Sequence, residues 1–307
     1  MNFMRLKWLY FLISAVVIVP GIFSLLRWGL KPSIDFTGGT LWELEFASPV
    51  NSDQLSAISE ALKENSIEYS SVQTSGENRV LIKAKPIKRE IAVSLNSAIA
   101  QKVNEKPTEL RFDTVGPTLG KELIRKTLIA IALAAGFILL YVWRQFKDPM
   151  FGVSAILAMF HDSLVLLGVF SLLGHFAGVE IDTLYVTAVL TILSFSVHDT
   201  VVVYDRIRES QKKFPGVPFV ELVNKAVTET LSRSINNSMT IIFMLVALYL
   251  LGGPTTKWFV FALLIGTISG TYSSTFTAAP LLVVWHDLRQ AKIKRTFSFP
   301  LMRKKMA

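Results

Sequence analysis

The sequence contains no cysteine, and it lacks the motifs of several chemistries that work inside or beside membranes. Without cysteine, disulfides, thiolate nucleophiles and cysteine-ligated zinc are excluded. The chain also has no His-Glu-x-x-His zinc motif, no Gly-x-Gly-Asp or Gly-x-Ser-x-Gly protease motif, and no Gly-x-x-x-x-Gly-Lys phosphate loop. We therefore expect a protein that is not an enzyme, that holds no metal or cofactor, and that takes no energy from a nucleotide bound to this chain.

Charged residues are also sparse. They make up 18% of the 307 residues, whereas 51% are hydrophobic and the mean hydropathy is +0.45. Such a chain is too apolar for a soluble domain and is typical of an integral membrane protein. The net charge is +9, and the positive residues lie beside the apolar runs. Contact with lipid head groups and the control of membrane topology therefore explain the charge better than binding to nucleic acid does.

Six apolar runs are long enough to cross a membrane. The first is followed by Arg27 and Trp28 rather than by a small-residue cleavage site, so we expect an uncleaved span. The predicted spans are residues 8–26, 127–143, 150–173, 183–204, 236–251 and 258–285.

The segment 31–125 differs in kind, because it is polar and its apolar residues recur with a period of either two or about 3.6 residues. Strand patterns and helix patterns alternate in the order β-α-β-β-α-β, which is the order of a ferredoxin-like module. The sequence therefore predicts an α-helical membrane protein with six transmembrane helices and an α+β ferredoxin-like domain between spans 1 and 2. The predicted strands are 40–46, 67–73, 79–84 and 108–115, and the predicted helices are 52–65 and 88–103.

The basic residues predict the orientation, because short cytoplasmic loops are rich in Lys and Arg. The loops 174–182 and 252–257 hold almost none, whereas the other connections between spans and both ends are basic. We therefore expect a multi-pass protein of the cell inner (cytoplasmic) membrane, with both termini cytoplasmic and the ferredoxin-like domain extracytoplasmic. The predicted domains are 1–30 (N-terminus and span 1), 31–125 (external domain), 126–286 (spans 2–6) and 287–307 (basic tail).

Two cytoplasmic segments have patterns of their own. In the loop 205–233, Pro218 precedes an apolar face formed by Phe219, Val223 and Ala226, which predicts an amphipathic helix on the membrane surface. The tail from Arg289 to Ala307 carries seven Lys and Arg. We interpret the tail as a segment that contacts anionic membrane lipids and keeps the C-terminus on the cytoplasmic side. Contact with nucleic acid or the ribosome is the alternative.

The stretch Thr187–Glu209 organises the chain, because His198 and Asp199 fall within an apolar run. Four polar residues share one helical face, namely Thr187, Thr191, Ser194 and His198. A carboxylate inside a membrane costs about 2.5–3.5 kcal/mol on insertion scales, which makes it a functional hypothesis by default. Asp199 is either a proton-binding carboxylate or a structural acid held by a salt bridge.

Other polar residues could support Asp199. Arg233 opens the next span at the same leaflet, and Asn237 and Thr240 share its face. Asp162, next to His161, lies deeper in its own span and is either a supporting proton site or a structural acid.

Small side chains form a stripe on the last span, made of Gly266, Gly270, Ser274 and Thr277. Small residues let another helix approach closely. The sequence leaves open whether that helix is internal or belongs to a partner.

Five motifs in chain order resemble the SecD/SecF family and cover nearly the whole chain. They are Ile34–Thr40 (IDFTGGT) after the first span, Val115–Gly120 (VGPTLG), His198–Glu209 (HDTVVVYDRIRE), Arg233–Thr240 (RSINNSMT) and Gly252–Pro254 (GGP). The resemblance implies a fold related to resistance-nodulation-division (RND) exporters and a role as a subunit of the bacterial Sec translocase. The implied partners are SecD, the SecYEG channel and unfolded exported proteins, and the implied energy source is the proton gradient.

The resemblance also implies site residues. The family's fourth-span acid and the arginine that opens its fifth span are linked to proton passage, and they match Asp199 and Arg233 here. Many relatives have Asn where this chain has His198, so His198 either adds a titratable group or replaces an amide. Together with Asp162, these three residues form the predicted proton-translocation set, without a catalytic, cofactor-binding or metal site.

Two other functions remain as alternatives. One is half of a proton-driven small-molecule or lipid exporter of the RND type, although those chains carry two six-span halves and larger external domains. The other is a passive scaffold in which the buried acids are structural. Dependence of activity on the proton gradient separates the scaffold from the first two functions.

Overall fold

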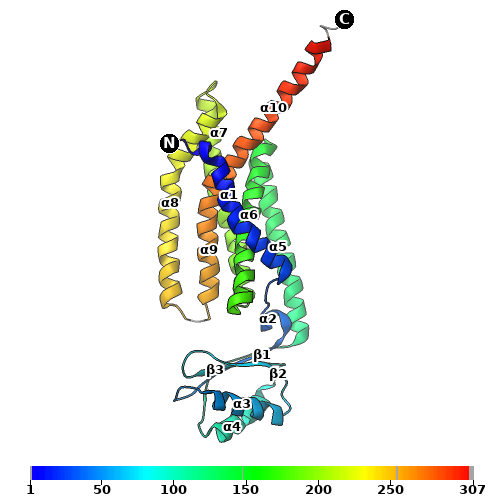
Figure 1. The fold of residues 1–307 in the computed structure, drawn as a ribbon, viewed down its shortest axis with the longest axis vertical. Helices are drawn as coiled ribbons and strands as arrows, with labels where there is room; N and C mark the ends of the chain where they lie inside the picture. The colour runs from blue at the N-terminus through cyan, green and yellow to red at the C-terminus, as the bar shows by residue number, and fades with distance from the viewer. Residues whose placement is uncertain (1, 147, 254, 304–307) are drawn as a thin grey trace. The chain divides into compact units, whose positions relative to one another are not determined.

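The computed structural model describes residues 2–146, 148–253 and 255–303, and its internal contacts divide the chain into two units. One unit joins the N-terminal residues up to Lys31 with the chain from Ile131 onward, and the other is Pro32–Ala130. Figure 1 shows the long helices of the first unit and the small sheet of the second. The side chains of the basic tail beyond Ala291 lie outside the described residues.

Six helical segments are long and apolar enough to cross a membrane, which confirms the six predicted spans. The first five are α1 (Lys7–Arg27), α5 (Pro117–Gln145), α6 (Pro149–Ala177), α7 (Thr183–Lys213) and α8 (Phe219–Leu251). The sixth combines α9 (Lys257–Ser273), a π-helical turn labelled η2 (Ser274–Ala278) and the start of α10 (Ala279–Arg303).

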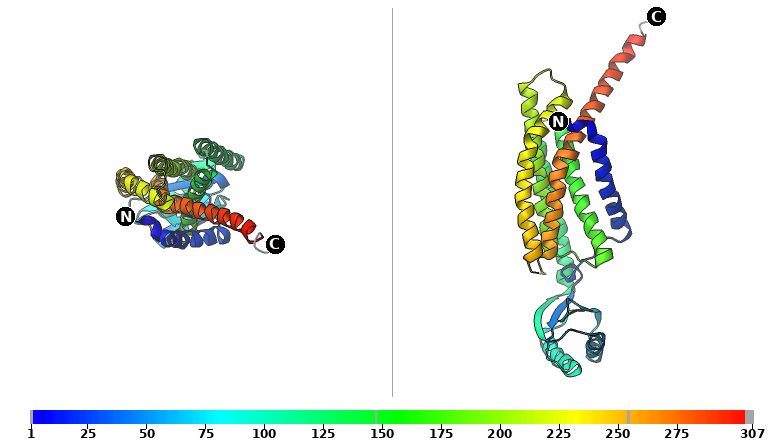
Figure 2. Two further views of the ribbon diagram at one scale, coloured as in Figure 1. Left: turned by 90° about the horizontal axis from the view of Figure 1, so that it is seen from above. Right: turned by 60° about the vertical axis from the view of Figure 1, so that its left-hand side comes forward.

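The helices α7 and α9 occupy the middle of the bundle. They pack against each other, and each also contacts α6 and α8. Figures 1 and 2 show α8 and α9 running side by side. A residue on α7 or α9 is therefore well placed to interact with groups from several spans.

The helix α1 lies along α6 in a constant register. The pairs Ser14–His161 and Ser24–Ser171 are hydrogen-bonded, and each pair is 147 positions apart. Gly21 and Gly168 have the same separation and bring the two backbones together. A constant offset requires the two helices to run parallel, so one seam holds α1 to α6 along their length.

The start of α8 differs from the sequence-based expectation. An amphipathic helix on the membrane surface was predicted in the loop 205–233, but α7 continues to Lys213 and that helix is the start of α8, which runs unbroken from Phe219 to Leu251. The apolar face of Phe219, Val223 and Ala226 is buried in the bundle core. The face stays in helical register with Ser234 and Ser238 further along, so nothing in the pattern ends the helix.

Basic connections meet at one end of the helical unit. There Lys7 pairs with Asp287 at 2.9 Å, and Arg289 pairs with Asp148 at 3.4 Å. At the opposite end Lys31 pairs with Glu180 at 3.6 Å. The bundle therefore has a basic end, where the first residues of α1 and the loop between α7 and α8 also lie, and an end with few basic residues.

The second unit contains a four-stranded antiparallel sheet with strand order β2-β3-β1-β4. Its elements follow one another as β1, α3, β2, β3, α4 and β4. Their bounds are β1 Gly39–Glu45, α3 Ser52–Glu64, β2 Tyr69–Thr74, β3 Arg79–Ala84, α4 Arg89–Val103 and β4 Thr108–Val115.

The core of this unit follows from the alternation of its strands. In β1, Trp42 and Leu44 are buried and their neighbours are half-buried, which packs one face of the sheet against apolar residues of α3 and α4 such as Ile58 and Leu95. Asn51 and Gln54 form a capping box that starts α3.

Lys102 joins the exposed sides of α3 and α4. Its ammonium donates to Glu64 at 2.7 Å and reaches Glu60 at 3.4 Å. The hydrogen bond to Glu64 raises the pKa of Lys102. Lys102 therefore stays charged at neutral pH.

The two motifs that flank this unit in the sequence contact each other. A short helix, α2 (Ile34–Thr37), is followed by Gly38, whose φ of +74° favours glycine. A Cβ on Gly120 would lie 2.7 Å from the carbonyl oxygen of Phe36, and one on Gly38 would lie 3.0 Å from the Cα of Pro117. Glycine at both positions therefore lets the entering and leaving segments of the unit pack backbone against backbone.

Candidate functional site

The helix α7 has two polar faces with different surroundings. The predicted face of Thr187, Thr191, Ser194 and His198 is exposed on this chain. The opposite face is buried and also polar, because Ser196, Asp199 and Thr200 lie on it. The sequence predicted the polar stripe but not that Asp199 would face into the bundle of its own chain.

Asp199 is 5% exposed and is held by two hydroxyl groups. Ser234 of α8 donates a short hydrogen bond to Oδ2, and Ser274 of the π turn donates to the same oxygen at 3.3 Å. Oδ2 therefore receives hydroxyl groups from two other spans.

A cavity of about 270 Å³ adjoins Asp199 between α7 and α8. Arg233, His198 and Asn237 line it with Asp199, so three of the four predicted site residues share one space. Among the described residues, no salt bridge joins Arg233 to Asp199, and His198 has no hydrogen-bond partner. Asp199 and Arg233 thus line the same cavity but do not contact each other directly.

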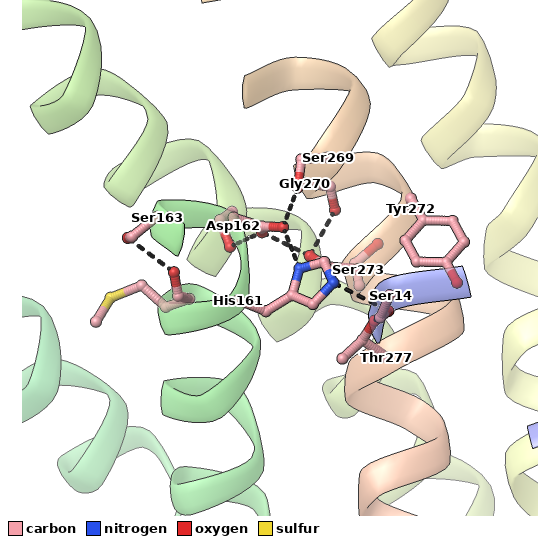
Figure 3. Close-up of polar contacts among 12 residues, drawn as sticks. Ser14, His161, Asp162, Ser163, Ser269, Gly270, Tyr272, Ser273 and Thr277 are labelled. Atoms are coloured by element: carbon pink, nitrogen blue, oxygen red, sulfur yellow. Dashed lines mark hydrogen bonds and ion pairs between the residues drawn. The ribbon is translucent and has the colours of Figure 1, made fainter. Parts of the chain in front are cut away.

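Asp162, the fourth predicted residue, lies in a second polar centre on α6 (Figure 3). It is 1% exposed and accepts hydrogen bonds at 2.6 Å from each of Ser196, Ser269 and Ser273. His161 contacts the same carboxylate, with 3.0 Å between Nδ1 and Oδ1. Ser196 of α7, which bonds Asp162, lies three residues before Asp199. The two acids nevertheless have separate sets of hydrogen-bond partners.

Sequence reasoning missed the serines that hold both acids. Ser274 was predicted only as a small residue for close helix packing, and Ser234 only as a neighbour of Arg233. A usable pattern was present on α7, where Ser196 precedes Asp199 by three residues and so lies on the same face. The partners on α9 could not be found this way, because their register against α6 depends on tertiary packing.

No three His, Asp or Glu side chains converge as a metal site within the described ranges. The groups that hydrogen-bond the two acids are instead hydroxyls and one imidazole. Such groups can hold a carboxylate in its charged form, and they can rearrange around it when it takes up a proton.

The fold and the site define a multi-pass membrane protein with two hydrogen-bonded carboxylates buried in its helix bundle. Residues 95–288 match the family described as "Protein export membrane protein SecD/SecF, C-terminal". The chain belongs to this family, which confirms the resemblance of its five motifs.

Similar proteins agree over nearly the full length. The chain is 43% identical to a protein translocase subunit SecF of Thermobaculum terrenum and 39% identical to one of Anaerolinea thermophila, covering 93% and 94% of this chain and 94% of each relative. A crystal structure of SecDF, described as a translocon-associated membrane protein from Thermus thermophilus, aligns with a TM-score of 0.81 at 34% identity. The alignment covers 94% of this chain but only 39% of the SecDF chain. These matches support a role in protein export.

Proposed function

We propose that this chain is an accessory subunit of the Sec translocase that pairs with SecD and uses the proton gradient to assist export through SecYEG from the outer face of the membrane. It does so without enzymatic chemistry of its own. The observation that carries the proposal is the buried Asp199, held by hydroxyls from two spans and facing a cavity with Arg233.

This arrangement suits reversible proton binding. Burial favours the neutral form of a carboxylate, whereas hydroxyl donors and a nearby cation favour the charged form. Arg233 lines the same cavity, but within the described residues it forms no ion pair with Asp199. The carboxylate can therefore be neutralised either by the nearby guanidinium or by a bound proton. His198 lines the cavity as well and supplies a further group that can carry a proton.

The exposed face of α7 supports pairing with a partner subunit. Thr187 and Thr191 bond their own helix, which makes them tolerable in lipid, but His198 has no such partner within the described chain. Ionisable side chains within membranes nearly always face protein or water. A relative from Thermus thermophilus named SecDF matches 86% of this chain with only 36% of its own length, which leaves room in one polypeptide for a SecD-like part.

The topology completes the proposal. The basic end of the helical unit faces the cytoplasm by the positive-inside rule, which places both termini there. Residues 31–125 then lie outside, as a ferredoxin-like domain on the side where exported, unfolded chains emerge. The described basic residues at the cytoplasmic end also suit contact with anionic lipids.

Affinity purification of the full-length chain from solubilised membranes tests the assignment. We expect mass spectrometry to find SecD and SecY with the wild type. Leucine at Thr187, Thr191 and Ser194 together should reduce recovery of SecD, because these residues share the exposed face of α7 with His198 and the larger leucine side chains would obstruct a partner packed there. Recovery of neither SecD nor SecY with the wild type would contradict the proposal.

A matched control is Thr228→Leu on α8. Thr228 is exposed and bonds the carbonyl of Asn224 in its own helix, as Thr191 bonds that of Thr187. Thr228→Leu should therefore leave the recovery of SecD unchanged. Equal losses in both variants would mean that the polar face of α7 has no special role in assembly.

A further inference from the structure

Four polar groups contact the carboxylate of Asp162, which fills the roughly four acceptor sites of an ionised carboxylate. Three serine hydroxyls from α7 and α9 donate to it at 2.6 Å, in addition to the contact with His161. Among the described residues, His161 is the basic side chain that contacts Asp162, and the two form an ion pair only when the imidazole is protonated. The net charge of this buried pair therefore depends on the protonation of His161.

The surroundings of His161 fit both of its protonation states. Nδ1 lies 3.0 Å from Asp162, and Nε2 lies 3.0 Å from the hydroxyl of Ser14 on α1 (Figure 3). In neutral histidine one ring nitrogen donates and the other accepts, whereas both donate in the protonated form. A hydroxyl can donate or accept, so Ser14 only has to rotate, and Thr277 lies 3.4 Å away to take its hydrogen. A proton can be added without leaving a buried group unpaired.

Two consecutive serines, the last residue of α9 and the first of η2, contact the two buried acids. Ser273 donates to Asp162, and the next residue, Ser274, donates to Asp199. These serines stand at the junction of α9 with its π-helical turn, a local geometry that is frequent at functional sites. On α7, Ser196 and Asp199 make a second connection, three residues apart on one face.

From these contacts we infer that His161 and Asp162 form a second proton-binding site, coupled to Asp199 through the Ser273–Ser274 turn. The inference rests on the proposed function of Asp199. Its consequence reaches α1, because the proton on His161 sets the hydrogen-bond direction of Ser14.

Other titratable groups pack around this site. Tyr272 of α9 has its ring centroid 6.3 Å from that of His161, and its hydroxyl donates to the backbone carbonyl of Tyr10 on α1. On α7 the nearest acid along the helix is Asp199, and Thr277 of the π turn does not titrate. A cavity of about 270 Å³ borders Ser14, His161, Ser269 and Tyr272, and its remaining lining residues are aliphatic.

The test is a pH titration of the full-length chain in lipid nanodiscs with ¹⁵N-labelled histidine, followed by NMR. The chain has four histidines, and the resonances of His161 are assigned from their loss in His161→Gln. The titration covers about pH 5–8, the range in which histidine can switch charge. We expect the imidazole signals of His161 to change, because the partners of both ring nitrogens fit either protonation state. An imidazole that keeps one protonation state across this range overturns the proposed site.

Coupling is tested in the same assay. We expect Asp199→Asn to move the midpoint of the His161 titration by about one pH unit, which is the size that defines interacting sites. Ser274→Ala, in an otherwise wild-type chain, should alter the midpoint as well. The matched control is Thr271→Val, which removes a hydroxyl bonded to Ser238 but contacts neither acid. If the midpoint is the same in wild type, Asp199→Asn and Ser274→Ala, the coupling is refuted.

These outcomes are distinguishable from a failure of the proposed function. The titration requires no partner and no export, so His161 can titrate in a chain that takes no energy from protons. Conversely, an export defect in Asp199→Asn with an unresponsive His161 would retain the proposed function and remove the second site. If Asp199→Asn does not fold, Ser274→Ala carries the coupling test alone.

Discussion

The seam between α1 and α6 depends on two glycines that cross in van der Waals contact. A Cβ placed on Gly168 would lie 2.6 Å from the Cα of Gly21, and one on Gly21 would lie 2.9 Å from the Cα of Gly168. The obstructing atoms are backbone, so no side chain can rotate away. In Gly168→Ala the helices must separate or shift, and overpacking of this kind costs about 1–3 kcal/mol.

Gly152→Ala on the same helix is a matched control, because a Cβ there meets no atom within 4 Å. Both substitutions gain the same helix propensity, which is about 1 kcal/mol in favour of alanine, so that gain cancels in the comparison. We expect the free energy of unfolding of Gly168→Ala, measured by denaturant titration, to be about 1–3 kcal/mol lower than that of Gly152→Ala. Equal stability of the two variants would refute the close crossing and with it the register that places Ser14 against His161.

Three further predictions follow from the topology, the small unit and the cation. A reporter inserted at the open turn of Gly76 should be labelled from outside and one fused after Ala307 from the cytoplasm, and the reverse labelling would contradict the orientation. Residues 38–116, which contain the whole core around Trp42, should form a soluble fragment with mixed helix and strand by circular dichroism; a disordered fragment would contradict an independent core. Arg233→Met should lose gradient-stimulated export, because a carboxylate without a nearby cation favours its protonated form. Its combination with Asp199→Asn should be no worse than either single variant, and an additive loss would place the two residues in separate steps.

Local sequence patterns were sufficient to predict most of the helices and strands of this protein. Apolar length predicted the six spans, and the alternation in residues 40–46 predicted the strand that buries Trp42 and Leu44. The membrane-surface position predicted for the helix that begins at Phe219 was wrong, because the apolar face of Phe219 and Val223 packs in the core of the bundle. Local amphipathicity cannot distinguish a helix lying on lipid from one that packs on its own bundle.

The site was only partly predictable for a different reason. Asp199, Arg233 and Asp162 are conspicuous in a sequence because charge inside a membrane is costly. The serines that hold the two acids are not conspicuous, since Ser and Thr are ordinary in membrane helices and bond their own backbone. Whether Ser273 meets Asp162 depends on the packing of α9 against α6 and on the π turn that follows, and neither is written in the local pattern.

Export driven by the proton gradient tests the central claim most directly. Moving one charge through the membrane potential is worth about 2.3 kcal/mol per 100 mV, and Asp199→Asn keeps the shape of the side chain but cannot exchange that proton. The measurement is export of a reporter protein with and without an uncoupler, alongside recovery of SecD, with Asp287→Asn at the exposed Lys7 pair as the control acid. The account predicts that Asp199→Asn recovers SecD normally and loses the uncoupler-sensitive part of export, whereas Asp287→Asn retains it. Full uncoupler-sensitive export by Asp199→Asn would contradict the account and favour a passive scaffold.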